Sequence, residues 1–191
     1  MLCKKCGAFF SDTAAPIAVY CHKCDDHAYD RAFALGVYEK ALSASILHLK
    51  STPTVPARLK KLISERVSGI EADVIIPAPL SKMRGLERGF NQAALLARIV
   101  GHAGEIPVDE LSLQRKKHTP IHRVGMDQRA RELTVEKAFE VTRPKLIDGK
   151  SVILVDDVLT SGSTAAACAK VLKKNGARRV EVFTVARAVM H

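Results

Sequence analysis

Two adjacent acids and a short hydroxyl-rich loop are the residues of this 191-residue chain with the clearest chemical meaning. Asp156 and Asp157 follow the apolar run 151–155, and the small residues 160–164 come next, directly before a segment with helical spacing. Small residues let backbone N–H groups approach an anion, and the N-terminus of a helix favours negative charge. The loop is therefore predicted to bind a phosphate group. It lacks the lysine of a P-loop, and the chain has no GxGxxG dinucleotide fingerprint.

The two carboxylates place a second requirement on the ligand. They would repel a neighbouring phosphate unless they face another group, such as sugar hydroxyls or a metal ion. A ribose 5-phosphate offers hydroxyls and a phosphate in one molecule. The competing interpretation is an ordinary turn whose acids cap a helix.

Four of the five cysteines form two CxxC pairs near the start of the chain: Cys3 with Cys6, and Cys21 with Cys24. This spacing is close to that of zinc ribbons, in which each pair donates two thiolates to a tetrahedral ion. A segment this short cannot bury enough surface to fold alone, so a structural zinc site of four cysteines is predicted. The alternatives are two disulfides, a redox pair, or a site in which His22 or His27 replaces a cysteine. Cys168 is predicted to be a core residue.

The elements that must position these residues alternate between strands and helices. Short apolar runs predict buried strands over 73–78, 151–155 and 179–186. Apolar residues at helical spacing predict helices over 91–100 and 163–174. Strands separated by helices indicate βαβ crossovers, so the prediction is an α/β fold with a mainly parallel sheet. In open α/β sheets ligands bind at the carboxyl ends of the strands, where the two acids lie.

The rest of the chain completes this plan. Residues 38–68 have helical spacing interrupted at Pro53 and Pro56, which predicts two short helices with a turn between them. Residues 114–132 are rich in cations and poor in apolar side chains, which predicts a loop. The chain is thus expected to divide into a zinc-ribbon-like module, 1–30, and an α/β domain, 31–191, with 38–68 as a helical lead-in.

Composition and charge narrow the class of protein. Hydrophobic residues make up 47% and charged residues 26%, which excludes disordered and collagen-like proteins. Lys and Arg number 30 against 20 Asp and Glu, and this net charge of +10 indicates a polyanionic partner, either nucleic acid or a phosphorylated metabolite. No run approaches the roughly 20 apolar residues of a membrane span, and no secretory signal is present, so a cytoplasmic location is predicted.

Several motifs resemble known families. The segment VILVDDVLTSGST resembles the phosphoribosyl diphosphate signature of type I phosphoribosyltransferases. The resemblance extends along most of the chain to the ComF family of competence proteins, which pair a four-cysteine zinc finger with a phosphoribosyltransferase domain. The matching segments are YEKALSASILHLK, DVIIPAPLSKMRGLERGFNQAALLA and HTP…R…AF. Two departures are Thr-Ser-Gly where Thr-Thr-Gly is common, and Ile121-His122 where the family often has Gln after Thr-Pro.

The resemblance implies a type I phosphoribosyltransferase fold that binds phosphoribosyl diphosphate with Mg²⁺. Asp156 and Asp157 would bind the ribose 2- and 3-hydroxyls, and the 5-phosphate would be held by Thr160, Ser161, Gly162, Ser163 and Thr164. The diphosphate would be held by Ser81, Lys82, Arg84 and Arg88, cations that suit phosphate oxygens, although solvated surface cations are the alternative. The mobile catalytic loop of the family would correspond to Arg115, Lys116, Lys117 and His118.

Roles in catalysis follow from the same resemblance. Asp156, Asp157 and Arg88 are the predicted catalytic residues. His118 and His122 are candidates for a general base, with solvated surface histidines as the alternative. Asn91 is expected either to cap its helix or to contact the ligand.

Two functions stay open on this basis. One is a Mg²⁺-dependent phosphoribosyltransferase with an unidentified acceptor, and the other is a non-enzymatic module that keeps the pocket to sense phosphoribosyl diphosphate or to bind DNA. Resemblance to the ComF family implies a role in natural transformation, with single-stranded DNA and competence proteins as partners. The net charge and the zinc finger favour DNA contact, whereas an aromatic content of 5% and the absence of Trp oppose base stacking. The sequence predicts neither the acceptor nor the oligomeric state.

Overall fold

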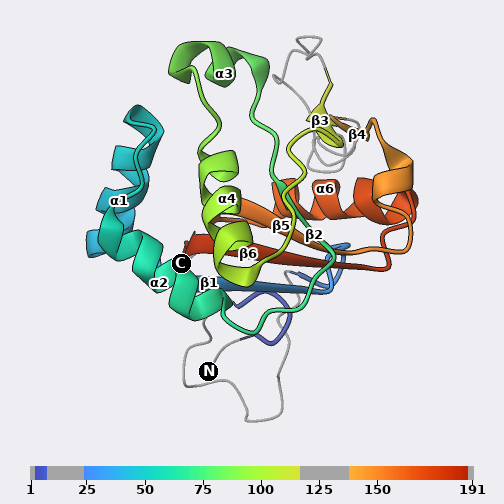
Figure 1. Cartoon of the computed structure of the whole chain (residues 1–191), viewed down its shortest axis with the longest axis horizontal. Coiled ribbons are helices and arrows are strands. Elements are labelled where there is room, and N and C mark those ends of the chain that lie inside the picture. Colours follow the sequence, from blue (N-terminus) through green and yellow to red (C-terminus); the bar gives the residue numbers. More distant parts are fainter. Residues whose placement is uncertain (1–2, 8–23, 117–137, 189–191) are drawn as a thin grey trace.

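A parallel sheet forms the centre of the protein. The computed structural model describes residues 3–7, 24–116 and 138–188, and Figure 1 shows their arrangement. Four parallel strands lie in the order β1-β6-β5-β2. Their bounds are β1 Arg31–Val37, β6 Arg179–Arg187, β5 Ser151–Leu159 and β2 Val74–Pro77. The prediction of an α/β fold with a mainly parallel sheet is confirmed.

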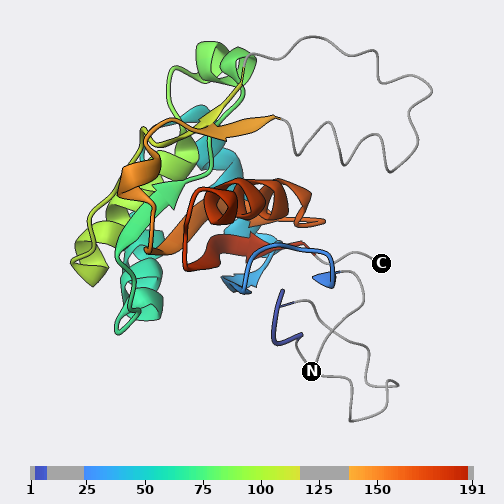
Figure 2. The ribbon, with the colours of Figure 1, turned by 90° about the vertical axis from the view of Figure 1, so that its right-hand side faces the viewer.

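Alternate residues of the central strands supply two separate cores. Val152 and Leu154 of β5 face helix α6 (Ser163–Lys174), whereas Ile153 and Val155 face the opposite layer. That layer consists of α1 (Lys40–Ser51), α2 (Ala57–Val67) and α4 (Gln92–Gly104). Figure 2 shows the two layers on either side of the sheet. A strand buried on both faces has to be apolar at successive positions, which explains the run VILV.

The predicted helices are found with small changes in their ends. Helix α6 has the predicted bounds, and α1 and α2 are the two short helices of the lead-in, separated by Pro53 and Pro56. Strand β5 is longer than the predicted 151–155 because its pairing with β6 continues to Leu159. Asp156 and Asp157 therefore lie inside the strand and not beyond its end.

Five elements were not predicted. The edge strand β1 pairs along its length with β6, and Lys82–Arg88 form the short helix α3. Residues Leu113–Arg115 form strand β3, which pairs antiparallel with β4 (Phe139–Val141). The prediction of a loop was therefore wrong at residues 114 and 115, and residues 117–137 lie outside the described part of the chain. A 3₁₀ turn, η2 (Pro144–Leu146), leads toward β5.

The described part of the first 30 residues packs on the α6 side of the sheet. Cys3, Cys6, Cys24 and Tyr29 belong to the same core as Cys168 and Leu172 of α6. The backbone N–H of Ala32 in β1 donates to the carbonyl of Lys5 at 2.6 Å. Cys168 is fully buried, which confirms it as a core residue. The division of the chain at residue 30 stays a prediction. Within the described residues, no helix combines the length and apolar character needed to cross a membrane.

Candidate functional site

A polar pocket lies at the carboxyl ends of β2 and β5. Its volume is about 320 Å³. Its lining includes eight of the residues predicted from the sequence: Ser81, Arg84, Arg88, Arg115, Asp156, Asp157, Thr160 and Thr164. Residues from the loop after β2, from β3 and from the end of β5 thus converge, as expected for the carboxyl edge of an open α/β sheet.

The acid pair lies near the carboxyl end of β5, with one acid on each face of the sheet. Asp157 is on the face of α1 and α4, where its Oδ2 atom accepts from Gln92 Nε2 at 3.4 Å, and its Oδ1 atom accepts from the Val158 N–H at 2.8 Å. Successive residues of a strand point to opposite faces, so Asp156 is on the α6 face. Both acids still line the pocket because it lies over the strand end.

The environment of Asp156 changes its acidity. Its Oδ1 atom accepts from the Asp157 N–H at 2.8 Å. Burial, together with the charge of the neighbouring Asp157, raises the pKa of Asp156 from 3.8 to about 8. Asp156 therefore keeps its proton at neutral pH until a cation or hydrogen-bond donors enter the pocket. Such a pair is suited to accept hydrogen bonds from a diol.

Lys50 is a pocket residue that the sequence interpretation missed. It lies in the last turn of α1, and its Nζ atom is 3.6 Å from Asp157 Oδ2. Lys50 precedes its partner Asp157 by 107 residues, so the contact cannot be recognised from neighbouring residues in the sequence. The segment YEKALSASILHLK, which resembles the family, ends on this lysine and was the one available signal. Gln92 is a second missed residue, because the sequence indicates only that it opens a helix.

The loop after β5 has the features of an anion site. Gly162 is the N-cap of α6 and has a left-handed backbone, with φ of +82°, which favours glycine. No acid lies in the first turn of α6. The hydroxyls of Ser161 and Ser163 are 2.9 Å apart, and Thr160 and Thr164 line the pocket. Ser161, Gly162 and Ser163 belong to this loop without lining the pocket themselves.

Helix α3 presents two arginines to the pocket. Ser81 caps the helix by accepting from the Arg84 N–H at 3.4 Å. Arg84 and Arg88 are four residues apart and so share one face of the helix. The Nη1 atom of Arg88 is buried, and no residue in the described part of the chain accepts a hydrogen bond from it. A buried donor without an acceptor indicates a place for an anion.

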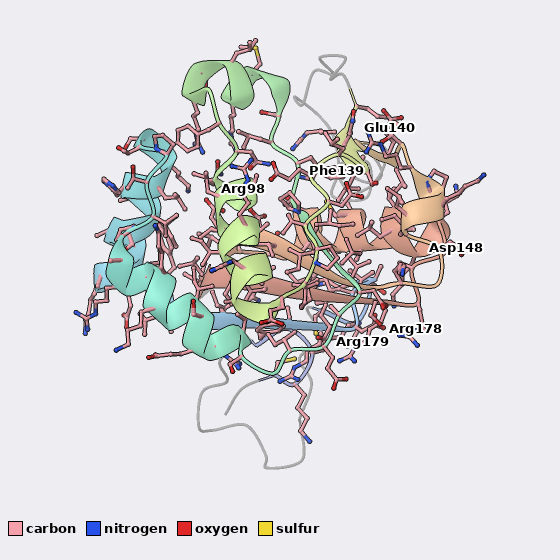
Figure 3. All side chains as sticks on the ribbon, in the orientation of Figure 1. Arg98, Phe139, Glu140, Asp148, Arg178 and Arg179 are labelled. Carbon is pink, nitrogen blue, oxygen red and sulfur yellow. The ribbon has the colours of Figure 1, made fainter. Side chains whose placement is uncertain are left out.

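The remaining predicted contacts have different positions. Arg115 lines the pocket from strand β3, and its guanidinium is 5.3 Å from the ring centre of Phe139. Lys116 does not line it, and its Nζ atom is 3.8 Å from Glu140 Oε2. Figure 3 shows Phe139 and Glu140 on β4. Lys82 begins α3. Five of the named residues lie outside the described ranges: Cys21, His22, Lys117, His118 and His122.

The cysteines form a second candidate site. The sulfur atoms of Cys3, Cys6 and Cys24 lie within 4.8 Å of one another, and those of Cys3 and Cys24 are 3.7 Å apart. Tetrahedral zinc with Zn–S bonds of 2.3 Å requires sulfur atoms about 3.8 Å apart, so the spacing suits such an ion. The Cys6 N–H donates to Cys3 Sγ at 3.5 Å, which directs the first pair toward one centre.

A glycine closes the first turn of this cluster, and the candidate histidine lies outside it. Gly7 follows Cys6 with φ of +66°, and its N–H donates to the Cys3 carbonyl at 2.9 Å, which closes the first turn. His27 was an alternative ligand, but it is not part of the cluster, and its Nδ1 atom is 2.6 Å from the hydroxyl of Tyr29. The residues therefore fit a metal ion held by cysteine thiolates.

Comparison with known proteins identifies the family. Residues 49–189 match the phosphoribosyl transferase domain. Competence protein F of Haemophilus influenzae is 31% identical over 183 residues, which cover 90% of this chain and 80% of that protein. The chain belongs to the ComF family of phosphoribosyl transferase domain proteins. The resemblance predicted from the sequence motifs is thus confirmed.

Other relatives of this ComF-family chain agree with that assignment. DNA utilization protein YhgH of Salmonella typhimurium is 30% identical over 98% of this chain and 85% of its own length. Competence protein ComFC of Bacillus subtilis is 34% identical over 60% of this chain and 45% of its own length. Among solved structures, the glutamine phosphoribosylpyrophosphate amidotransferase of B. subtilis has a TM-score of 0.51 at 20% identity. That match covers 73% of this chain and 30% of the enzyme, and it shows a shared fold.

Proposed function

We propose that this ComF-family protein binds phosphoribosyl diphosphate and, with Mg²⁺, transfers its phosphoribosyl group to an acceptor. The observation that carries the proposal is the distribution of charge in one pocket. One pocket brings together the acids Asp156 and Asp157, threonines of an anion-binding loop and the arginines of α3. A ligand that has hydroxyls and two separate phosphate groups matches this combination.

Each part of the pocket has a role in the proposed complex. The loop 160–164 holds the 5-phosphate through its hydroxyls and the N-terminus of α6. Asp156 and Asp157 accept hydrogen bonds from the ribose hydroxyls. Arg84, Arg88 and Arg115 hold the diphosphate, and the buried Nη1 atom of Arg88 gains an acceptor. Lys82 joins them from the first turn of α3.

The proposed reaction is a displacement at the anomeric carbon of the ribose. The bond from that carbon to the diphosphate oxygen breaks, the diphosphate leaves with the bonding electrons, and the acceptor forms the new bond. Arg84 and Arg88 stabilise the negative charge that develops on the leaving group. Asp156 and Asp157 are the acids of the pocket that could hold Mg²⁺, which when bound would supply further neutralisation of that charge.

The decisive experiment is calorimetric titration of the metal-loaded protein with phosphoribosyl diphosphate and Mg²⁺. We expect micromolar affinity, a free energy of about −8 kcal/mol. The double variant Asp156→Asn, Asp157→Asn is expected to lose that binding while it stays folded. Asp148→Asn is the matched control, because this exposed carboxylate lies at the amino-terminal end of the strands, away from the pocket (Figure 3). Equal binding by a folded double variant would contradict the assignment.

The names of the relatives support a second proposal about biological role. We propose that the protein acts in the cytoplasm during natural transformation, where it contacts single-stranded DNA. The support is the net charge of +10, together with relatives described as competence and DNA utilization proteins. Binding to random single-stranded DNA should weaken steeply as salt rises, because phosphate neutralisation releases counterions. Absence of binding at about 50 mM salt would contradict this role.

The cysteine cluster is proposed to hold structural zinc. Cys3, Cys6 and Cys24 provide three thiolates, and Cys21 is predicted to provide the fourth. Four sulfur ligands leave no coordination position for a substrate, so the metal would stabilise the module and take no part in the transfer reaction.

A further inference from the structure

A buried arginine connects the cysteine cluster to the phosphate loop. Arg187, the last residue of β6, is 7% exposed. Its Nη2 atom donates to Cys6 Sγ at 3.9 Å, and its Nη1 atom donates to the carbonyls of Leu159 at 3.2 Å and Thr160 at 2.6 Å. One guanidinium therefore joins a predicted metal ligand to the start of the loop that is proposed to bind the 5-phosphate.

The contact with Thr160 orients the loop backbone. No cis peptide bond occurs in the described residues, so the N–H of Ser161 points away from the carbonyl of Thr160 across a planar trans peptide. Because that carbonyl faces Arg187, the Ser161 N–H faces away from Arg187. The side chain of Thr160 lines the pocket, whereas Arg187 does not. Arg187 thus keeps a carbonyl oxygen, which would repel phosphate, turned away from the anion.

A second contact joins the same two sites independently. The linker after Cys24 places His27 and Tyr29 against Gly162, where an added Cβ would lie 2.6 Å from His27 Cε1 and 3.1 Å from the Tyr29 hydroxyl oxygen. Asp30 fixes this linker to the sheet, since it accepts from the Val180 N–H at 2.7 Å and from Lys173 Nζ at 2.6 Å. A movement of the cysteine cluster is therefore transmitted to the loop 160–164 at two residues, Thr160 and Gly162.

The charge on Arg187 makes the connection depend on the state of the cysteines. Thiolates around a metal ion carry a net negative charge that compensates the buried guanidinium, whereas metal-free thiols are neutral near pH 7. A buried cation without its counter-charge is costly, and the side chain then leaves its position. We propose that Arg187 is a positioning residue that holds the phosphate loop in its binding conformation only while the cysteine cluster is metal-bound. This inference rests on the proposed binding of phosphoribosyl diphosphate.

The test compares Arg187, the last residue of β6, with Arg178, which directly precedes the strand. Arg187→Met removes the donors but keeps most of the side-chain volume, and Arg187→Lys keeps the charge. Arg178→Met is the matched control, because Arg178 is exposed and lies at the amino-terminal end of the strand (Figure 3). Affinity for ribose 5-phosphate, measured by calorimetry on zinc-loaded protein, should fall about tenfold in Arg187→Met, recover in part in Arg187→Lys, and stay unchanged in Arg178→Met.

A second measurement uses the reciprocity of coupled binding. If zinc raises the affinity for ribose 5-phosphate by some factor, ribose 5-phosphate must raise the affinity for zinc by the same factor. The equilibrium affinity for zinc, measured by competition with a colorimetric chelator, should therefore rise about tenfold when ribose 5-phosphate saturates the wild type or Arg178→Met, and should not rise in Arg187→Met. A purely structural role for Arg187 would lower the zinc affinity equally with and without the sugar phosphate.

The outcomes separate this inference from the proposed function. If the wild type binds phosphoribosyl diphosphate and ribose 5-phosphate equally well with and without zinc, the coupling is refuted and the function stands. If the zinc-loaded wild type binds neither ligand, the proposed function is refuted and the coupling falls with it. If Arg187→Met fails to fold, the wild-type measurement decides. A zinc affinity of the wild type that is the same with and without ribose 5-phosphate would overturn the coupling without any variant.

Discussion

Replacement of Gly162 by alanine should show how tightly the phosphate loop is held. The residue has φ of +82°, and a left-handed backbone costs a non-glycine residue about 1–2 kcal/mol. The new Cβ would also lie 2.6 Å from His27 Cε1. His27 cannot move freely, because its Nδ1 atom is 2.6 Å from the hydroxyl of Tyr29, which is 1% exposed. Overpacking adds about 1–3 kcal/mol, so the total loss of folding free energy is about 2–5 kcal/mol.

Two further glycines allow the two contributions to be separated. Gly149 has φ of +70° and nothing within 4 Å of an added Cβ, so Gly149→Ala should cost only the backbone part of about 1–2 kcal/mol. Gly85 lies in α3 with neither a left-handed backbone nor a close neighbour, so Gly85→Ala should be neutral or stabilise by up to about 1 kcal/mol. Gly162→Ala alone should suffer both penalties.

Thermal and denaturant unfolding of the three variants provide the assay. In a chain of this size, 1 kcal/mol corresponds to about 2–4 °C, so Gly162→Ala should melt about 4–20 °C below the wild type. Ribose 5-phosphate binding should weaken in the same variant, because the loop has to move away from His27. A melting temperature of Gly162→Ala equal to that of Gly149→Ala would refute the close contact, and the coupling argued from it would lose one of its two connections.

Three other predictions follow from the pocket and the cysteines. Because the pKa of Asp156 is raised from 3.8 to about 8 in the folded protein, the folded state binds one more proton than the unfolded state between these pH values. The free energy of unfolding should therefore fall as pH rises from 3.8 to about 8. Denaturant titrations of Asp156→Asn should show a shallower fall over the same range. Arg88→Met removes a buried donor that has no acceptor among the described residues, so its stability should equal or exceed that of the wild type. In calorimetry, this variant should lose more affinity for phosphoribosyl diphosphate than for ribose 5-phosphate. Equal losses for the two ligands would place Arg88 away from the diphosphate. Elemental analysis should find zinc in the wild type and a reduced content in Cys3→Ser, and equal zinc in both proteins would remove Cys3 from the site.

The sequence predicts the buried elements well because their burial is recorded in apolar patterns. The run VILV of β5 contributes to the cores on both faces of the sheet, and helix α6 starts after a hydroxyl-rich loop and ends at Asn175-Gly176. Both features are local, so they can be recognised without knowing the fold. The acids of the pocket follow directly from the strand that carries them.

Elements that depend on distant partners were missed. Strand β1 has the small residues Ala32, Ala34 and Gly36, and it forms by pairing with residues of β6 that lie 150 positions later in the chain. Helix α3 has a capping Ser81 and a left-handed Gly89 at its end, signals that could have identified it. Its apolar residues Met83 and Leu86 are exposed, so no buried periodicity marked the helix.

The same distinction applies to the candidate site. Arg84 and Arg88 were predicted as cations of a short segment, and α3 places them on one face. Lys50 and Arg187 were not predicted, because each gains its role from a partner far along the chain: Asp157 for Lys50, and Cys6 for Arg187. Residues that stand together in a motif can be recognised from the sequence, whereas residues whose role depends on a distant partner cannot.

The order of charges around the pocket also fixes the direction in which the proposed ligand lies. At the loop 160–164 the larger negative charge of a diphosphate would lie beside Asp156 and Asp157. The arginine next to this loop, Arg187, donates to the carbonyls of Leu159 and Thr160 and does not line the pocket. At α3 the same group meets two arginines, one of which has a buried donor without an acceptor. The smaller 5-phosphate is matched by backbone N–H groups and hydroxyls at the loop. In the proposed complex the anomeric carbon, which carries the diphosphate, therefore faces the arginines of α3.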